Sequence, residues 1–209
     1  MLFRKGHKAE DEYLISTGSG ASGDEYIIGM TIRDSSGNSI TLDQSTLAQS
    51  VIEYEHHEIH RGSFYRVDFQ KEVANGGTMI IGLTTPDTTK WLHFRPAVDV
   101  EVEASIILYE NVTSITGGTA YVPRNANRPS ANVSVATVVT DPTINTTGAV
   151  ILEDLVLGSA KSAGGNSEAT HEWVLKQNTR YALIVTNQTT GATNECNIRL
   201  SWYEHTDKS

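Results

Sequence analysis

The sequence predicts an all-β protein: an antiparallel, jelly-roll-like β-sandwich preceded by an extended N-terminal arm. Three observations support this fold class. Apolar and polar residues alternate in short runs, turn-forming residues separate these runs, and long amphipathic helical patterns are hard to find. Regular short strands with Gly, Asn and Pro between them are typical of sandwiches and jelly rolls. The 209 residues are enough for one such domain with its own core.

The clearest alternation runs from Val98 to Leu108 and predicts one half-buried antiparallel strand. Its apolar residues share one face, and Asp99, Glu101 and Glu103 share the other. These three carboxylates must face solvent or a partner, so we count them as candidate partner contacts. The other expected strands are Glu25–Arg33, Ser63–Gln70, Thr78–Thr84, Trp91–Arg95, Thr119–Pro123, Asn132–Thr140, Ala149–Leu157, His171–Lys176, Arg180–Thr186 and Asn197–Tyr203.

Turn chemistry marks the boundaries between these strands. The expected turns are Asn75–Gly77, Thr85–Asp87, Thr116–Gly118, Arg128–Ser130, Asp141–Pro142, Gly164–Asn166 and Thr190–Gly191. A short helix is expected at Asp43–Val51, where Asp43 can cap its first turn. Ser16–Asp24 has the composition of a flexible linker. The expected domains are therefore an arm and linker at residues 1–23 and a β-sandwich at residues 24–209.

The net charge of −9 disfavours a nucleic-acid partner, because an acidic surface repels phosphate backbones. The basic cluster of the chain is N-terminal, and its residues Arg4, Lys5 and Lys8 either face solvent or dock on an acidic neighbour. Apolar runs are far shorter than the roughly 20 residues that cross a bilayer, so no membrane partner is expected. The N-terminus lacks the apolar stretch of a secretion signal.

Residues that often carry chemistry have plain structural interpretations here. The single cysteine, Cys196, excludes an intrachain disulfide and is interpreted as a core or strand-edge thiol. Glu153 and Asp154 interrupt an apolar run and predict a bulge or an exposed edge rather than a buried acid. The tryptophans all fall in expected strands and are interpreted as core anchors: Trp91, Trp173 and Trp202.

A histidine-rich segment at residues 53–60 suggests a metal site. A zincin needs His-Glu-x-x-His, but the pair with that spacing, His56 and His60, has His57 in place of the glutamate. If the segment is extended, His56, Glu58 and His60 share one face and are candidate ligands of a metal-dependent hydrolase. We favour hydrogen-bonding residues in a packed strand or loop. With no nucleophile elbow, phosphate loop or dinucleotide motif in the sequence, we expect no enzyme activity, metal or cofactor.

Five phrases of the sequence point to a family. They are Glu55–Phe64, Leu83–Phe94, Gly117–Thr119 with Pro123–Arg128, Leu175–Tyr181, and Trp202–Asp207. The first resembles a His-His-Glu-x-His-x-Gly signature, and the second is similar to a Thr-Pro-x-Thr-Thr-Lys-Trp-x-His-Phe phrase. Both patterns are found in a group of tailed-bacteriophage virion structural proteins of the capsid decoration or cement type. The phrases extend over most of the chain, and the arm before them is more variable.

This resemblance implies a β module that decorates or cements the capsid through non-covalent contacts. The expected location is the virion, assembled in the cytoplasm of a bacterial host. The expected partners are the major capsid protein and neighbouring copies of the chain. By analogy with cement proteins at three-fold positions, we expect a homo-oligomer with trimeric symmetry. The alternative is a tail, baseplate or fibre-associated module that contacts the host surface or carbohydrate.

Overall fold

The computed structural model describes residues 13–16, 26–29, 54–159, 164–168 and 172–206. The chain divides into two compact units, residues 1–52 and residues 53–209. In the first unit, β1 (Tyr13–Ser16) pairs antiparallel with β2 (Tyr26–Gly29). The predicted helix at Asp43–Val51 and the boundary between residues 23 and 24 lie outside the described residues, so both stay predictions.

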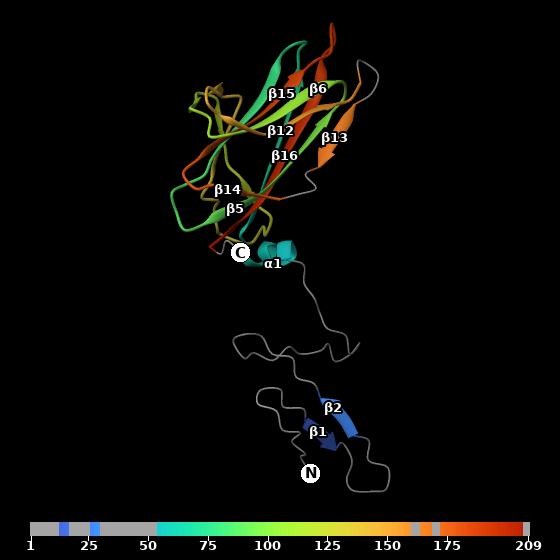
Figure 1. Cartoon of the computed structure of the whole chain (residues 1–209), viewed down its shortest axis with the longest axis vertical. Coiled ribbons are helices and arrows are strands. Elements are labelled where there is room, and N and C mark those ends of the chain that lie inside the picture. The colour runs from blue at the N-terminus through green and yellow to red at the C-terminus, as the bar shows by residue number, and fades with distance from the viewer. Residues whose placement is uncertain (1–12, 17–25, 30–53, 160–163, 169–171, 207–209) are drawn as a thin grey trace. The chain divides into compact units, whose positions relative to one another are not determined.

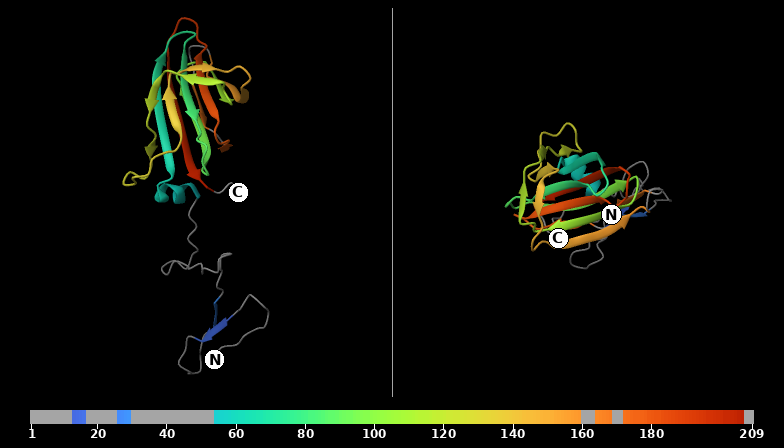
Figure 2. Two further views of the ribbon diagram at one scale, coloured as in Figure 1. Left: turned by 90° about the vertical axis from the view of Figure 1, so that its left-hand side faces the viewer. Right: turned by 90° about the horizontal axis from the view of Figure 1, so that it is seen from above.

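The second unit is a sandwich of two antiparallel sheets packed face to face, which confirms the predicted fold class (Figure 2). Sheet I contains, in order, β12 (Val150–Leu157), β6 (Ala104–Glu110), β15 (Arg180–Asn187), β4 (Thr78–Thr84), β10 (Thr137–Thr140) and β8 (Thr119–Tyr121). Sheet II contains β13 (Gly165–Glu168), β5 (Trp91–Val100), β16 (Asn194–His205), β3 (Phe64–Val73) and β9 (Arg124–Asn125), with β14 (Trp173–Leu175) also paired to β5. A separate small sheet pairs β7 (Ser114–Thr116) with β11 (Thr143–Asn145).

Alternation along the strands builds the core between the sheets. In β16 the side chains of Cys196, Ile198, Leu200 and Trp202 are each at most 2% exposed. Trp202 packs against Tyr65 of β3, with ring centroids 6.2 Å apart. Fully burying one large apolar side chain contributes about 1.5–3 kcal/mol, so this central strand is a major source of stability. The core positions predicted for Cys196 and Trp202 are confirmed.

The predicted single strand from Val98 to Leu108 is wrong, because it is two strands in different sheets. β5 ends at Val100 in sheet II, and β6 begins at Ala104 in sheet I. Burial still alternates through the turn at residues 101–103, so the sequence pattern shows no break. The signal that was missing is Asn194, a fully buried side chain that holds this turn from β16.

Two further predictions concern the strands at one edge of the sandwich. The bulge predicted at Glu153 is confirmed, because the pairing of β12 with β6 shifts register between Ile151 and Glu153, and β12 is an edge strand of sheet I. The turn predicted at Gly164–Asn166 is wrong, because β13 begins at Gly165 and pairs with β5. Glycine is needed at Gly164 because a Cβ there would clash with the carbonyl oxygens of residues 100 and 101.

The helix α1 (Tyr54–Arg61) lies at one end of the sandwich (Figure 1). In the part of the chain that the structure describes, no helix is long and apolar enough to span a membrane.

Candidate functional site

Five stretches that are far apart in the sequence meet at the end of the sandwich where α1 lies. We call this region the helix end; it comprises α1 with its C-terminal cap through residue 63, and residues 85–93, 124–136, 172–179 and 202–206. Backbone hydrogen bonds connect the stretches directly: the N–H of Glu204 donates to the carbonyl of Ser63 at 3.0 Å, and the N–H of Thr85 donates to the carbonyl of Thr179 at 3.0 Å. All five histidines that the structure describes belong to this end.

The histidine-rich segment forms α1 rather than the extended chain that we expected. The helix has an acid, Glu55, in its first turn and His60 and Arg61 in its last turn, which suits the helix dipole. It ends at Gly62, whose φ of 73° lies in the left-handed region. Gly62 N–H donates to the carbonyl of Ile59, and the next N–H donates to that of Glu58, both at 3.0 Å. This C-terminal cap explains why a short helix forms here.

The three candidate metal ligands do not converge on this helix. His56 and His60 lie one turn apart on the exposed face, with their Nε2 atoms 3.0 Å apart. Glu58 lies on the opposite side, only 2% exposed, where it accepts a hydrogen bond from Ser63 Oγ and contacts Nδ1 of His57 at 3.3 Å. Within residues 54–159, 164–168 and 172–206, no three His, Cys, Asp or Glu side chains are placed to hold a metal ion.

Asparagine side chains from β9 and the β9–β10 connection cover the C-terminus of α1. Asn125, 8% exposed, donates through Nδ2 to the carbonyl of Gly62 at 2.8 Å, and Asn132 donates to the same oxygen at 3.1 Å. Asn127 Nδ2 donates to the carbonyl of His60 at 3.0 Å. Carbonyl groups in the last turn of a helix have no partner within the helix. These amides supply the missing donors and fix α1 to the sandwich.

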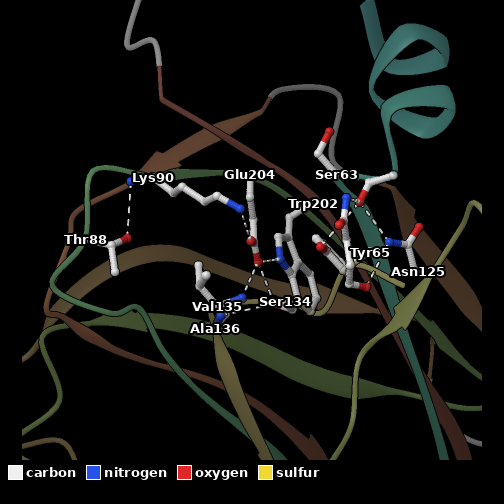
Figure 3. A network of polar contacts seen from close by, with 12 residues as sticks. Ser63, Tyr65, Thr88, Lys90, Asn125, Ser134, Val135, Ala136, Trp202 and Glu204 are labelled. Atoms are coloured by element: carbon white, nitrogen blue, oxygen red, sulfur yellow. Dashed lines mark hydrogen bonds and ion pairs between the residues drawn. The ribbon is translucent and has the colours of Figure 1, made fainter. Parts of the chain in front are cut away.

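A buried carboxylate ties the same connection to the last strand, as Figure 3 shows. Glu204 is 3% exposed, and its Oε1 accepts hydrogen bonds from Ser134 Oγ at 2.6 Å, Val135 N at 2.9 Å and Trp202 Nε1 at 3.2 Å. Its other oxygen, Oε2, has no hydrogen-bond donor among the described residues and is neutralised by Nζ of Lys90 at 3.8 Å. A buried charge is tolerated when donors and a counter-ion surround it. Glu204 therefore fixes residues 134 and 135 against β16.

A third polar cluster surrounds His93 on β5. Its Nδ1 lies 2.5 Å from Oε1 of Glu172, and the Tyr203 hydroxyl donates to the same oxygen at 2.8 Å. The His93 ring stacks on that of Tyr203, with centroids 4.4 Å apart and planes at 12°. This arrangement fixes the imidazole orientation and leaves Nε2 as its second donor or acceptor. In the described part of the chain, Nε2 is buried without a hydrogen-bond partner.

A hollow of about 330 Å³ lies where α1 meets the outer face of sheet II. Its charged lining residues are Glu55 of α1, Arg66 of β3, Arg95 of β5 and Arg199 of β16. Glu55 pairs with Arg95, with an Oε2 to Nη1 distance of 2.5 Å. This ion pair joins the helix to the sheet. The hollow is lined by three arginines and one glutamate, so its lining carries net positive charge although the whole chain is acidic.

The acidic partner-contact candidates are distributed differently from our expectation. Asp99 is held by Arg199 in a two-pronged ion pair, with both N–O distances at 3.0 Å. Glu101 and Glu103 lie in the turn between β5 and β6, at the end of the sandwich opposite to the helix end. They do not form one row on a strand face. The basic candidates Arg4, Lys5 and Lys8 lie outside the described residues.

The helix end also unites the phrases that carry the sequence resemblance. Each of the five contributes residues to it: Glu55–Phe64 forms α1 and its cap, and the others supply residues 85–93, 124–128, 175–179 and 202–206. Sequence reasoning missed Asn125 and Glu204 as parts of this region. Their partners lie 63 and 70 residues away, so no local pattern could identify them.

Comparisons with known proteins add no identification. No family model matches the chain, and no curated protein matches it. One solved structure, "Structure of infectious bursal disease virus Gt strain", is similar over 93% of this chain and 50% of that chain, with 12% identity and a TM-score of 0.15. The chain thus spans about half the length of that viral protein, and a likeness this weak supports no conclusion. Fold and site define a β-sandwich with one polar, histidine-rich end.

Proposed function

We propose that this chain is a structural virion protein of a tailed phage that decorates or cements the capsid surface, with the helix end as its docking surface. The main support is that all five phrases behind the resemblance contribute to the helix end. Residues needed only for a core would be spread through the sandwich. Residues gathered at one polar end are better explained by a shared partner.

The helix end is well suited to docking because its loops are already ordered by internal contacts. Residues 125–135 are held in place by two sets of hydrogen bonds. Glu204 accepts hydrogen bonds from residues 134 and 135, and the amides of Asn125 and Asn132 donate to the cap of α1. Ordering loops and side chains on association costs free energy, so a surface that is already held binds with less loss. On a particle with many equivalent positions, weak contacts of neighbouring copies add through effective concentration.

The proposed partners are the major capsid protein and neighbouring copies of the chain, in a homo-oligomer with trimeric symmetry. The proposed place is the outer surface of the virion head, and the role requires no catalysis and no cofactor. The non-covalent character of the attachment makes it measurable with purified capsids.

Site-specific blocking tests the docking surface. Thr89 at the helix end and Thr193 at the opposite end are both exposed, and the native thiol at Cys196 is buried. We would make Thr89→Cys and Thr193→Cys, attach a bulky polyethylene-glycol maleimide, and measure co-sedimentation with capsids lacking the protein. We expect label at residue 89 to weaken binding at least about tenfold and label at residue 193 to have little effect.

The unlabelled variants serve as folding controls, because each carries the same substitution without the bulky group. Equal binding of the two labelled forms, or loss with the residue 193 label alone, would contradict the helix end as docking surface. Binding to purified tails in place of heads would contradict the capsid role itself.

A further inference from the structure

The floor of the hollow beside α1 consists of short side chains, and long charged side chains surround it. Strand pairing places Ser201 of β16 between Arg66 of β3 and Arg95 of β5, and places Arg199 next to Ala97 of β5. All five residues line the hollow. Serine and alanine have short side chains, so the floor is low while three long guanidinium side chains surround it. Neighbouring positions on one sheet face are about 5 Å apart, which brings these groups together.

Two of the three arginines already hold a carboxylate. Arg95 binds Glu55 and Arg199 binds Asp99. The side chain of Arg66 is exposed, and within the described part of the chain its guanidinium forms no hydrogen bond or ion pair, although its backbone pairs with β16 and β9. Asp68 lies two residues along the same face but does not pair with it. Arg66 is therefore the one arginine of this hollow whose guanidinium is not paired with a carboxylate of the described chain.

We propose that this hollow binds a carboxylate group, with Arg66 as the guanidinium that receives it. The planar fork of arginine matches the two oxygens of a carboxylate in bidentate geometry. Glu55 and Asp99 show that the surrounding arginines already accept this group. At about 330 Å³ the hollow is at the small end of the range for ligand pockets, which suits a side-chain-sized group.

The hollow adjoins α1, so we extend the proposed docking surface from the helix end to include it. If that function is right, the bound carboxylate is an aspartate or glutamate side chain of the capsid protein. Only this last step rests on the proposed function. Binding of a free carboxylate by the isolated chain is independent of it.

The isolated full chain tests the pocket directly. We would titrate it with glutarate and follow arginine Nε–Hε signals by NMR, with sodium chloride at matched ionic strength as a screening control. We expect saturable shifts for Arg66, Arg95 and Arg199. Arg66→Gln should weaken binding at least about tenfold, because it removes the free guanidinium. Arg180→Gln removes the same charge from an exposed position on sheet I and should leave binding unchanged.

Several results would overturn the proposal. The proposal fails if the NMR shifts do not saturate with glutarate, or if sodium chloride produces the same shifts. It also fails if Arg66→Gln binds glutarate as tightly as the unmodified chain. Tighter binding of inorganic phosphate than of glutarate would also overturn the choice of a carboxylate. Both arginine variants change exposed residues, and unfolding curves of each would confirm that the fold is kept.

A second arm uses capsids. Weaker capsid binding by Arg66→Gln, together with competition by glutarate, would support a capsid side chain as the occupant. Capsid binding that Arg66→Gln does not change would overturn that occupant. A chain that binds glutarate normally but never binds capsids would contradict the proposed function and leave the pocket intact.

Discussion

At the scale of single residues, one buried amide determines where the chain crosses between the two sheets. Asn194 accepts hydrogen bonds from the N–H groups of Glu101 and Val102 at 3.0 and 3.1 Å. Its Nδ2 donates to the carbonyls of Val102 and Glu103 at 3.0 and 3.4 Å. The N–H of Glu101 also donates to the carbonyl of Glu195, and the carbonyl of Glu103 also accepts from the N–H of Gln188. The buried N–H and carbonyl of Val102 are therefore the groups that depend on Asn194.

We predict that Asn194→Ala lowers the free energy of unfolding by about 3 kcal/mol, because the buried N–H and carbonyl of Val102 lose their partner. Urea denaturation followed by tryptophan fluorescence measures the change. Asn197→Ala is the matched control, since Asn197 is partly exposed on the same strand and makes one 3.3 Å bond to Asp99. It should cost less than about 1 kcal/mol. Equal losses for the two variants would contradict the role given to Asn194.

The second residue-scale prediction concerns alkaline pH. Burial, with a smaller contribution from the charge of Glu195, raises the pKa of the Cys196 thiol from 9.0 to about 11. The folded chain therefore keeps this proton over a pH range where the unfolded chain loses it. Because the unfolded state then binds fewer protons, stability falls as pH rises from about 9 to about 11. At full effect the loss is about 3 kcal/mol.

Cys196→Ala should remove this part of the alkaline loss. We expect the unfolding free energies of the two proteins to differ by a constant amount below about pH 8 and to approach each other from about pH 9 upward. Burial and the charge of Glu204 raise the pKa of Tyr65 to about 12, so both proteins retain a further decline that begins near pH 10. Parallel curves through pH 11 would contradict the buried-thiol explanation.

At the scale of elements, the connection from β9 to β10 is held by side chains rather than by strand pairing. Glu204→Ala removes the acceptor for Ser134 and Val135, so this connection should open more often. Trypsin reports the opening by cleavage after Arg124 of β9, the strand that the connection leaves, because Arg128 within the connection is followed by proline. We predict at least about fivefold faster cleavage than in the unmodified chain. Glu195→Ala, a change of the same type in β16 where Glu195 pairs with Gln70, should leave the rate unchanged.

The same scale shows what the sequence could predict. β4 has the predicted bounds, Thr78–Thr84, because alternation and turn residues on both sides agree. The break at residues 101–103 could not be predicted, because alternation continues through it and the stabilising side chain lies 92 residues away. For α1, local signals did exist: Glu55 in the first turn, Arg61 in the last and Gly62 after it. The candidate site depends mainly on long-range polar contacts, which a sequence pattern does not contain.

At the scale of the whole molecule, the two ends of the sandwich differ in the structural elements and the side chains that they carry. The helix end carries α1 and the described histidines and adjoins the arginine-lined hollow on sheet II, whereas the opposite end carries the turns at residues 101–103 and 188–193. An asymmetric module of this sort fits a particle surface that is recognised from one side. The phrases that suggest a phage virion and the geometry of the helix end therefore lead to one hypothesis about orientation.

Imaging of the intact particle by cryo-electron microscopy tests this hypothesis most directly. We predict density for the β-sandwich on the outer surface of the head, with α1 and Arg66 facing the major capsid protein. Density only in the tail or baseplate would contradict the central claim. A head-bound sandwich with the turn at residues 101–103 facing the capsid would contradict the docking surface.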